Sequence, residues 1–183
     1  DVCSSDLQLT ASRPQSIAVI EAAEADDNLV GIFAQKNPED EEPGPEAMYG
    51  VGAIAKIHKV WRLPDGSVRL IVQGVRRATM GKIVQAKPHL RAVLEPLEDH
   101  GEADAMAVQA MCRSVHQQFQ SMVKILPHLP DELQIMVVNI DHPGRLADFI
   151  ASNLDLQIEE HQRLLEALEI EERLEYLTEL LAR

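Results

Sequence analysis

The feature that most constrains the fold is a change in the spacing of apolar residues near residue 99. Over residues 51–57 and again over 68–72 apolar side chains recur at every second position, the period of a strand with one buried face. Beyond residue 103 they recur every three or four positions, the period of an amphipathic helix. The sequence therefore predicts an α+β protein in which a β domain precedes a helical bundle.

Two strands joined by a tight turn form the clearest element of the first half. Apolar residues alternate over 51–57 and again over 68–72, and Leu63-Pro64-Asp65-Gly66 lies between them. Proline fixes φ and glycine accepts a positive φ, so this tetrapeptide predicts the turn of a β-hairpin. We also expect a helix over 14–25, a strand buried on both faces over 29–35, and strands over 78–85 and 89–94.

Prolines and polar residues divide the second half into helices, expected over 103–126, 131–138, 144–151, 155–168 and 171–181. Asp141 and Asp155 are the expected N-caps of the third and fourth, because a carboxylate accepts hydrogen bonds from the free N–H groups of a first turn. Residues 99–102 are interpreted as a linker between the β domain, residues 8–98, and the helical domain, residues 103–183.

The first seven residues do not continue into the pattern that follows them. They lack methionine and have neither the basic nor the apolar segment of a signal peptide. We expect residues 1–7 to be a non-native leader.

Charge is distributed unevenly along a chain whose formal net charge is −13. Residues 47–91 hold nine Lys or Arg and one acid, whereas residues 101–183 hold six Lys or Arg and fifteen Asp or Glu. The overall negative charge argues against general nucleic-acid binding, which requires a basic excess. The basic segment leaves two interpretations open, a solvated strand face or a patch for RNA or an acidic partner.

Catalytic and metal-binding motifs are incomplete. Ser121-Met122-Val123-Lys124 matches a short S-x-x-K pattern, but Met122 belongs to the apolar stripe of a helix and no supporting motif follows. The histidines show no metal-ligand spacing, and Gly81-Lys82 lacks the rest of a phosphate-binding loop. We expect no catalytic residue, no metal and no cofactor in this chain.

Cysteine content and hydropathy bear on location. The two cysteines do not form a disulfide framework, and no apolar run is long enough to cross a membrane. We expect a cytoplasmic protein without a membrane partner.

Six groups of segments occur in the order typical of one known family. They are Ser12–Ile17, Leu29–Pro38, Tyr49–Ala55, Leu63–Val68 with Gln73–Arg77, Pro143–Ala151 with Asn153–Leu154, and Glu171–Leu174. As an ordered set across residues 8–183, they resemble the N-terminal region of bacterial Lon ATP-dependent proteases.

The resemblance implies a PUA-like β domain, an antiparallel and partly closed barrel, followed by an α-helical bundle. It implies recognition of unfolded or damaged proteins and support of a homo-oligomer, a hexamer in full-length Lon. It further implies that the full-length family member is an ATP-dependent serine endopeptidase, whose ATP and Mg²⁺ are expected in downstream domains and not in this chain. The family's opening strand, which precedes Ser12, is expected to be missing or replaced by residues 1–7, which would expose a sheet edge.

Three alternatives stay open beside this interpretation. These are that the chain is a stand-alone Lon-substrate-binding-domain protein, that it is a purely structural assembly module, or, with least support, that it is a PUA-like RNA-binding module.

Exposed apolar side chains are the candidates for contact with substrates, because adaptable apolar surfaces bind without strict sequence demand. The candidate substrate contacts are Met48, Tyr49, Trp61 and Leu63. Near the C-terminal end, leucines with a/d-like spacing are candidates for assembly, namely Leu174, Leu177 and Leu181.

Overall fold

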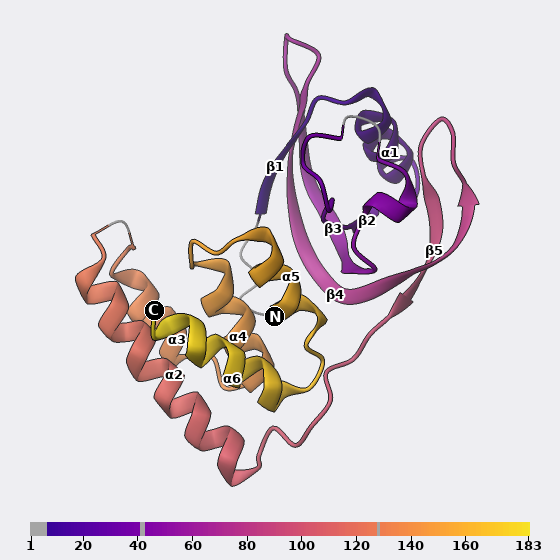
Figure 1. Cartoon of the computed structure of the whole chain (residues 1–183). Coiled ribbons are helices and arrows are strands. Elements are labelled where there is room, and N and C mark those ends of the chain that lie inside the picture. Colours follow the sequence, from indigo (N-terminus) through magenta and orange to yellow (C-terminus); the bar gives the residue numbers. More distant parts are fainter. Residues whose placement is uncertain (1–6, 41–42, 128) are drawn as a thin grey trace. The chain divides into compact units, whose positions relative to one another are not determined.

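The computed structural model describes residues 7–40, 43–127 and 129–183, which form two compact units (Figure 1). The β unit ends at Glu98 and the helical unit comprises Asp99–Arg183. The β unit contains β1 (Leu7–Ala11), α1 (Pro14–Glu24), β2 (Leu29–Ile32), the 3₁₀ helix η1 (Pro45–Ala47), β3 (Val51–Arg62), β4 (Val68–Gln85) and β5 (Arg91–Pro96). The helical unit contains α2 (Met106–Ile125), α3 (Glu132–Val138), α4 (Pro143–Ser152), α5 (Ile158–Glu166) and α6 (Ile170–Leu181). The predicted α+β class is confirmed.

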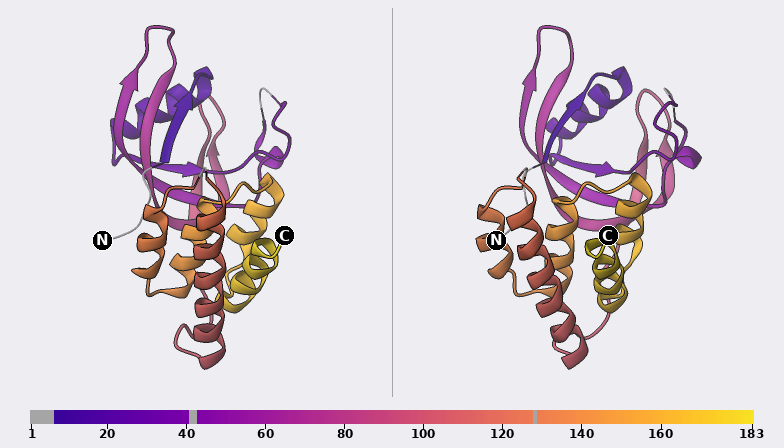
Figure 2. Two further views of the ribbon diagram at one scale, coloured as in Figure 1. Left: turned by 90° about the vertical axis from the view of Figure 1, so that its left-hand side faces the viewer. Right: turned by 60° about the vertical axis from the view of Figure 1, so that its left-hand side comes forward.

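The β unit is built on an open, five-stranded antiparallel sheet. β4 pairs with β3 over residues 68–79, with β1 over residues 68–72 and with β5 over residues 78–85. β2 pairs with the other side of β3. The strand order β1-β4-β3-β2 does not return to its start, so the sheet is not closed (Figure 2).

The alternation of apolar residues along β3 and β4 produces the core of the β unit. The inward positions of both strands are buried, and α1 packs its apolar side onto them. The buried residues of this core are Ile20, Ala23, Ala55, Ile57, Val68, Leu70 and Val72. Pro14 lies in the first turn of α1, where no helical partner exists for the N–H that proline lacks.

The predicted hairpin turn is present between β3 and β4. Leu63 N donates to Ser67 O at 2.9 Å, and Gly66 adopts the positive φ of 84° that glycine tolerates. Asp65 Oδ1 accepts hydrogen bonds from the hydroxyl of Ser67 at 2.7 Å and from its N–H at 2.9 Å. Because these bonds favour the ionised carboxylate, the pKa of Asp65 lies below its ordinary value.

The strand β1 contradicts the expectation of a missing opening strand. Leu7–Ala11 pairs with β4 from Val72 to Val68, and Leu9 and Ala11 pack against the core. The start of β4 is therefore not left as an open edge. Leu7 belongs to this strand, while residues 1–6 of the expected leader lie outside the described part of the chain.

Two other strand predictions were inaccurate. β2 ends at Ile32 and leaves Leu29 exposed, so it is an edge strand with one covered face and not a strand buried on both. The strand expected over 78–85 is the second half of β4, which continues without interruption from Val68. Its middle contains Gly74 and two arginines, which break the apolar alternation, but backbone pairing with β3 continues past a bulge.

The helical unit surrounds a separate apolar core. α2, α4 and α6 contribute its most deeply buried side chains, and the rings of Phe119 and Phe149 meet edge to face at 6.4 Å. The large apolar side chains of this unit with essentially no exposed surface are Val115, Phe119, Val137, Leu146, Ile150, Leu174 and Leu177. The wide apolar stripe predicted for these helices is thus their packing surface.

The two predicted N-caps were wrong by one or two residues. α4 is capped by His142, whose Nδ1 accepts from Gly144 N at 3.2 Å, because Pro143 fixes the first turn and makes the residue before it the cap. α5 begins after Gln157, which forms a capping box with Glu160. Asp141 and Asp155 therefore lie outside the capping positions.

Candidate functional site

Trp61 is an exposed aromatic side chain on the outer face of the β3–β4 hairpin, with 44% of its surface exposed. It pairs with Arg69 of β4, and Arg69 pairs on its other side with Thr10 of β1. Because directly paired residues direct their side chains to the same face of a sheet, these three form one row.

A second row lies beside the first. Lys59 pairs with Ile71, which pairs with Gln8 of β1. Where β3 and β4 pair, Trp61 lies diagonally across from Ile71, and Lys59 lies diagonally across from Arg69. We call the six residues the Trp61 face: Gln8, Thr10, Lys59, Trp61, Arg69 and Ile71.

A shallow hollow of about 340 Å³ opens on this face. Trp61, Leu63, Arg69 and Gln8 line it. The structure thus brings together two of the substrate-contact candidates, Trp61 and Leu63, and adds a cation and an amide beside them. A hollow of this size accommodates one or two side chains of a partner.

The cations of the Trp61 face are available to an external carboxylate. Within the described residues, neither Lys59 nor Arg69 forms an ion pair, and none of the six residues of the face is acidic. The neighbouring Arg62 differs, because its Nη2 lies 2.8 Å from Glu24 of α1. The face therefore combines an aromatic surface with unneutralised positive charge.

The other two substrate-contact candidates lie at the opposite end of β3. Met48 forms an isolated bridge with Gln35, and Tyr49 N donates to Ala34 O at 2.9 Å. Both side chains are half-buried. Met48 and Tyr49 precede β3, whereas Trp61 is near its end, so the four candidates form two separate pairs.

The leucines proposed for assembly are core residues of the helical unit. Leu174 and Leu177 have no exposed surface and Leu181 retains 9%. Their spacing attaches α6 to the other helices of its own unit. Assembly through these side chains would require α6 to leave the bundle.

A buried arginine is the main polar feature of the helical unit. The side chain of Arg173 is 1% exposed, and its Nη1 and Nη2 donate to the two carboxylate oxygens of Asp99 at 3.1 and 2.6 Å. Its Nε donates to Ala167 O at 2.8 Å, and Asp148 Oδ1 lies 3.5 Å from Nη1. We call Asp99, Gly144, Asp148, Ala167 and Arg173 the Arg173 cluster. The two parallel hydrogen bonds from Arg173 to Asp99 have the geometry of a strong charge-assisted pair.

Because Gly144 has no side chain, it leaves room for the side chains of Asp99 and Arg173. A Cβ at this position would overlap Asp99 Oδ2 and lie 3.2 Å from Arg173 Nη1. Asp99 and His100, expected to belong to a linker, are thus held by the helical unit, since His100 N also donates to Leu168 O at 2.8 Å. The signal in the sequence was Arg173 itself, which interrupts the apolar stripe of α6 beside Leu174.

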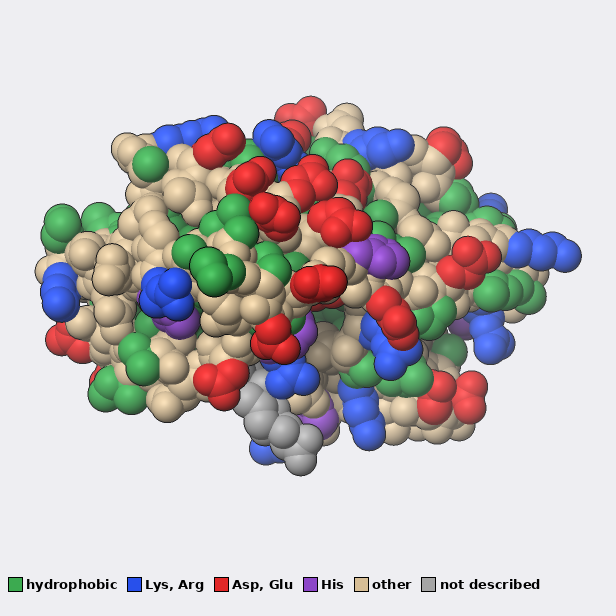
Figure 3. All heavy atoms as spheres, turned by 90° about the horizontal axis from the view of Figure 1, so that it is seen from below, with side chains coloured by type: hydrophobic (Ala, Val, Ile, Leu, Met, Phe, Trp, Pro, Cys, Tyr) green, Lys and Arg blue, Asp and Glu red, His purple; other side chains and the backbone are tan. Residues whose placement is uncertain are grey.

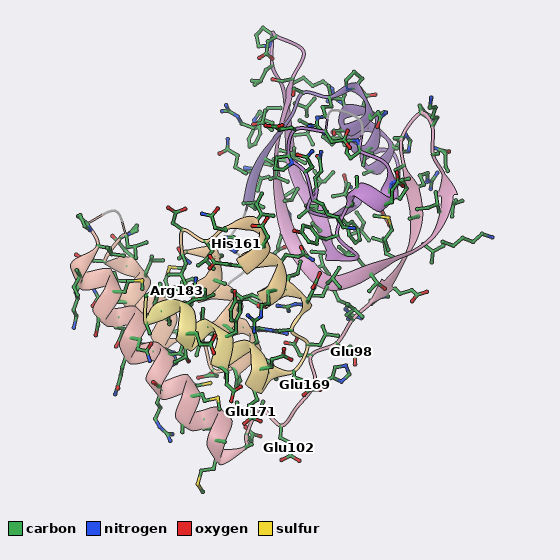
Figure 4. The ribbon with its side chains drawn as sticks, viewed as in Figure 1. Glu98, Glu102, His161, Glu169, Glu171 and Arg183 are labelled. Carbon is green, nitrogen blue, oxygen red and sulfur yellow. The ribbon has the colours of Figure 1, made fainter. Side chains whose placement is uncertain are left out.

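The exposed surface of the helical unit is acidic. Glu169 occupies the N-cap position of α6 without a capping side-chain hydrogen bond, and Glu171 lies in the first turn, whereas Arg183 follows the end of the helix and pairs with Glu160 (Figure 4). Acidic side chains gather on one face of the molecule (Figure 3). The sign of this charge is opposite to that of the Trp61 face.

Neither a membrane-spanning helix nor a metal-binding cluster occurs among the described residues. No helix there is long and apolar enough to cross a bilayer. No group of three or more His, Cys, Asp or Glu side chains in residues 7–40, 43–127 and 129–183 is arranged to hold a metal ion.

The fold places the chain in a class of α+β modules in which an open antiparallel sheet precedes a bundle of helices. It belongs to the family described as "ATP-dependent protease La (LON) substrate-binding domain", whose family model matches residues 5–183. The resemblance inferred from the ordered segments is confirmed.

Whole Lon proteases are among its relatives. The chain is 39% identical to the Lon protease of Heliobacterium modesticaldum over 179 residues, covering 97% of this chain and 22% of that protein. It is 37% identical to the Lon protease of Dictyoglomus thermophilum over 177 residues, covering 97% and 22%. The chain therefore spans about a fifth of the length of the curated relatives that it matches.

Solved structures agree on the fold. The N-terminal domain of a Mycobacterium avium complex Lon protease superposes with a TM-score of 0.77 at 22% identity, over 99% of this chain and 92% of that one. A Lon N-terminal domain protein from Xanthomonas campestris gives a TM-score of 0.61 at 15% identity, over 99% and 90%.

Proposed function

We propose that this chain is a non-catalytic part of a Lon-type ATP-dependent protease that recognises unfolded or damaged proteins on the Trp61 face. The observation that carries the proposal is the exposure of Trp61 beside a hollow that Leu63 and Arg69 also line. Native proteins bury most of their large apolar side chains, whereas unfolded proteins present them. An exposed aromatic side chain on this chain is therefore expected to bind unfolded proteins in preference to native ones.

The size of the face indicates a weak interaction. The six residues of the Trp61 face and Leu63 are far fewer than the roughly 20–30 residues that each partner contributes to a stable protein–protein interface. We therefore expect dissociation constants in the micromolar range or weaker, which suits a site that must release its substrate. Aromatic side chains carry much of the energy in such contacts, since they bury a large area at small entropic cost.

Replacing Trp61 by Ala is expected to weaken binding of an unfolded protein about tenfold, the equivalent of about 1.4 kcal/mol. The measurement is fluorescence anisotropy of a labelled model protein, kept unfolded by reduction and alkylation of its cysteines. Its native form provides the first control. Val84→Ala provides the second, because Val84 is 66% exposed in the same unit but belongs to another part of the sheet. Equal affinity for unfolded and native protein, or equal losses in the two variants, would contradict capture on the Trp61 face.

Support of a homo-oligomer is the second proposed function. α3 exposes apolar side chains, with Ile135 at 69% and Val138 at 57%, and residues three apart lie on one side of a helix. These positions are accessible, unlike the buried leucines of α6.

Replacing Ile135 and Val138 together by Ser is expected to reduce self-association, because it removes apolar surface without affecting the core. Sedimentation velocity over a concentration series measures the effect. Met106→Ser is the matched control, since Met106 is 87% exposed at the start of α2. Unchanged sedimentation of the double variant would exclude this surface from assembly.

The same proposal assigns ATP and Mg²⁺ to other parts of the protease and requires no cofactor in this chain. It places the protein in the cytoplasm, a location that its buried free thiol at Cys112 supports.

A further inference from the structure

Among the described residues, no strand pairs with the outer edge of β3 over its last residues. β2 pairs only with residues 53–56, and Ile57 N donates to Asn28 O at 2.8 Å. Residues 59–62 pair with β4 on one side and, within the described chain, with no strand on the other. The right-hand view of Figure 2 shows β3 as the outermost strand of the projecting hairpin.

The hydrogen-bond pattern of the hairpin determines which backbone groups face this edge. Leu63 N donates to Ser67 O across the turn, and hydrogen-bonded pairs alternate with non-bonded pairs in an antiparallel ladder. Trp61 and Lys59 therefore direct their N–H and C=O groups towards β4. Val60 and Arg62 direct theirs away from it. We call residues 59–62 the β3 edge; its outward backbone groups are a template for another strand.

We propose that the β3 edge binds an extended segment of the substrate as an added β-strand. In this strand an apolar residue lies opposite Trp61, and a carboxylate two residues away lies opposite Lys59. The proposal rests on the proposed function, for which it supplies the binding geometry. Residues two apart in a strand project to the same face, so both side chains of the segment meet the Trp61 face.

Strand addition explains how one small face accepts many sequences. The backbone groups of Val60 and Arg62 can pair with any extended chain, whatever its side chains. A natively folded protein has few such segments free, because its backbone groups already have partners. Lys59, which has no ion pair within the described residues, adds a preference for acidic segments.

The charges of the β3 edge disfavour two other occupants. Pairing of two copies along this edge would bring Lys59 and Arg62 of one chain close to the same cations of the other, and like charges across strands are destabilising. RNA does not offer the alternating backbone donors and acceptors of a strand, and the chain carries a net charge of −13 with a single tryptophan.

The backbone component is tested by comparing Arg62→Pro with Arg62→Ala. Both variants remove the ion pair with Glu24, but only proline removes the outward N–H, and Trp61 before it already has the extended conformation that proline requires. The probe is a labelled peptide of about ten residues with Leu-Ser-Asp at its centre. We expect Arg62→Ala to bind within about twofold of the unmodified chain and Arg62→Pro at least about fivefold more weakly. Amide spectra must first show that both variants are folded. Equal peptide affinity of the two folded variants would then overturn strand addition.

The charge component is tested by exchanging the signs of both partners. A matched peptide with Leu-Ser-Lys at its centre is expected to bind about threefold to tenfold more weakly than the Asp peptide. Lys59→Glu is expected to reverse this order. A preference that the substitution leaves unchanged would exclude Lys59 as the residue facing the carboxylate.

Amide hydrogen exchange separates failure of this inference from failure of the proposed function. We expect the Asp peptide to slow exchange at Val60 and Arg62 of the full chain. Peptide binding that depends on Trp61 but leaves both amides unprotected would preserve capture and overturn strand addition. Absence of any preference for unfolded protein would overturn both. Protection of Val60 and Arg62 that appears without peptide as the chain is concentrated would assign the edge to a second copy. Protection that appears with single-stranded RNA would assign it to nucleic acid.

Discussion

Replacing Arg173 by Met is expected to destabilise the helical unit by about 3 kcal/mol, near the lower end of the range for breaking a buried ion pair. The guanidinium is 1% exposed and satisfies both oxygens of Asp99 together with Ala167 O. Methionine fills much of the volume but leaves these acceptors without their donors. Asp99 retains 23% of its side-chain exposure, so water compensates part of the loss and the upper end of the range is not expected.

Urea denaturation followed by circular dichroism at 222 nm measures this effect, because most of the helix lies in the helical unit. Trp61 is the only tryptophan, so its fluorescence reports the β unit separately in the same samples. Arg145→Met is the matched control, since Arg145 is an exposed arginine on α4. Equal losses for Arg173→Met and Arg145→Met would show that the Arg173 cluster does not stabilise the fold.

Replacing Gly144 by Ala is expected to destabilise the helical unit by about 1–3 kcal/mol, the usual cost of forcing an extra group into a packed site. The sign is informative, because the same change inside an ordinary helix stabilises it by about 1 kcal/mol. Here the new Cβ would overlap Asp99 Oδ2, so the carboxylate must move away from Arg173.

A double-mutant cycle with Asp99→Ala tests this explanation. Once the carboxylate is absent, Gly144→Ala should lose most of its cost, which gives a coupling free energy of about 1 kcal/mol or more. Gly74→Ala is the steric control, since a Cβ at Gly74 meets nothing within 4 Å. A stabilising effect of Gly144→Ala in the unmodified chain would show that the cluster adjusts without cost.

Local patterns predicted the parts of the fold whose partners are close in sequence. The hairpin of β3 and β4 follows from two alternating runs and the turn at Leu63–Gly66, and the helices follow from their apolar stripes. The pairing of β1 with β4 was missed because it joins residues 7 and 72. No local signal shows that Leu7–Ala11 completes the edge of β4.

The candidate site was predictable to the extent that it lies on the hairpin. Trp61 and Leu63 adjoin the predicted turn, and counting outward from that turn also places Arg69 opposite Trp61. Gln8 was not predictable because it comes from β1. Met48 and Tyr49 were grouped with Trp61 on side-chain type alone, which contains no information about distance.

The helical unit shows a different limit of sequence interpretation. The spacing of Leu174, Leu177 and Leu181 is the same for packing within a chain and packing between chains. Only the positions of the other helices show that these side chains lie in the core. The pair between Asp99 and Arg173 was equally inaccessible, because its members lie 74 positions apart.

The length of β4 has a consequence for the order in which the β unit folds. One strand serves three neighbours, of which β3 and β5 adjoin it in sequence and β1 does not. Closing a short loop costs less chain entropy than closing a long one, so we expect the two hairpins to form early and β1 to dock onto a surface that already exists. Local opening of the native sheet is then expected to begin where folding finished, with release of Leu7–Ala11 while the remaining strands stay paired.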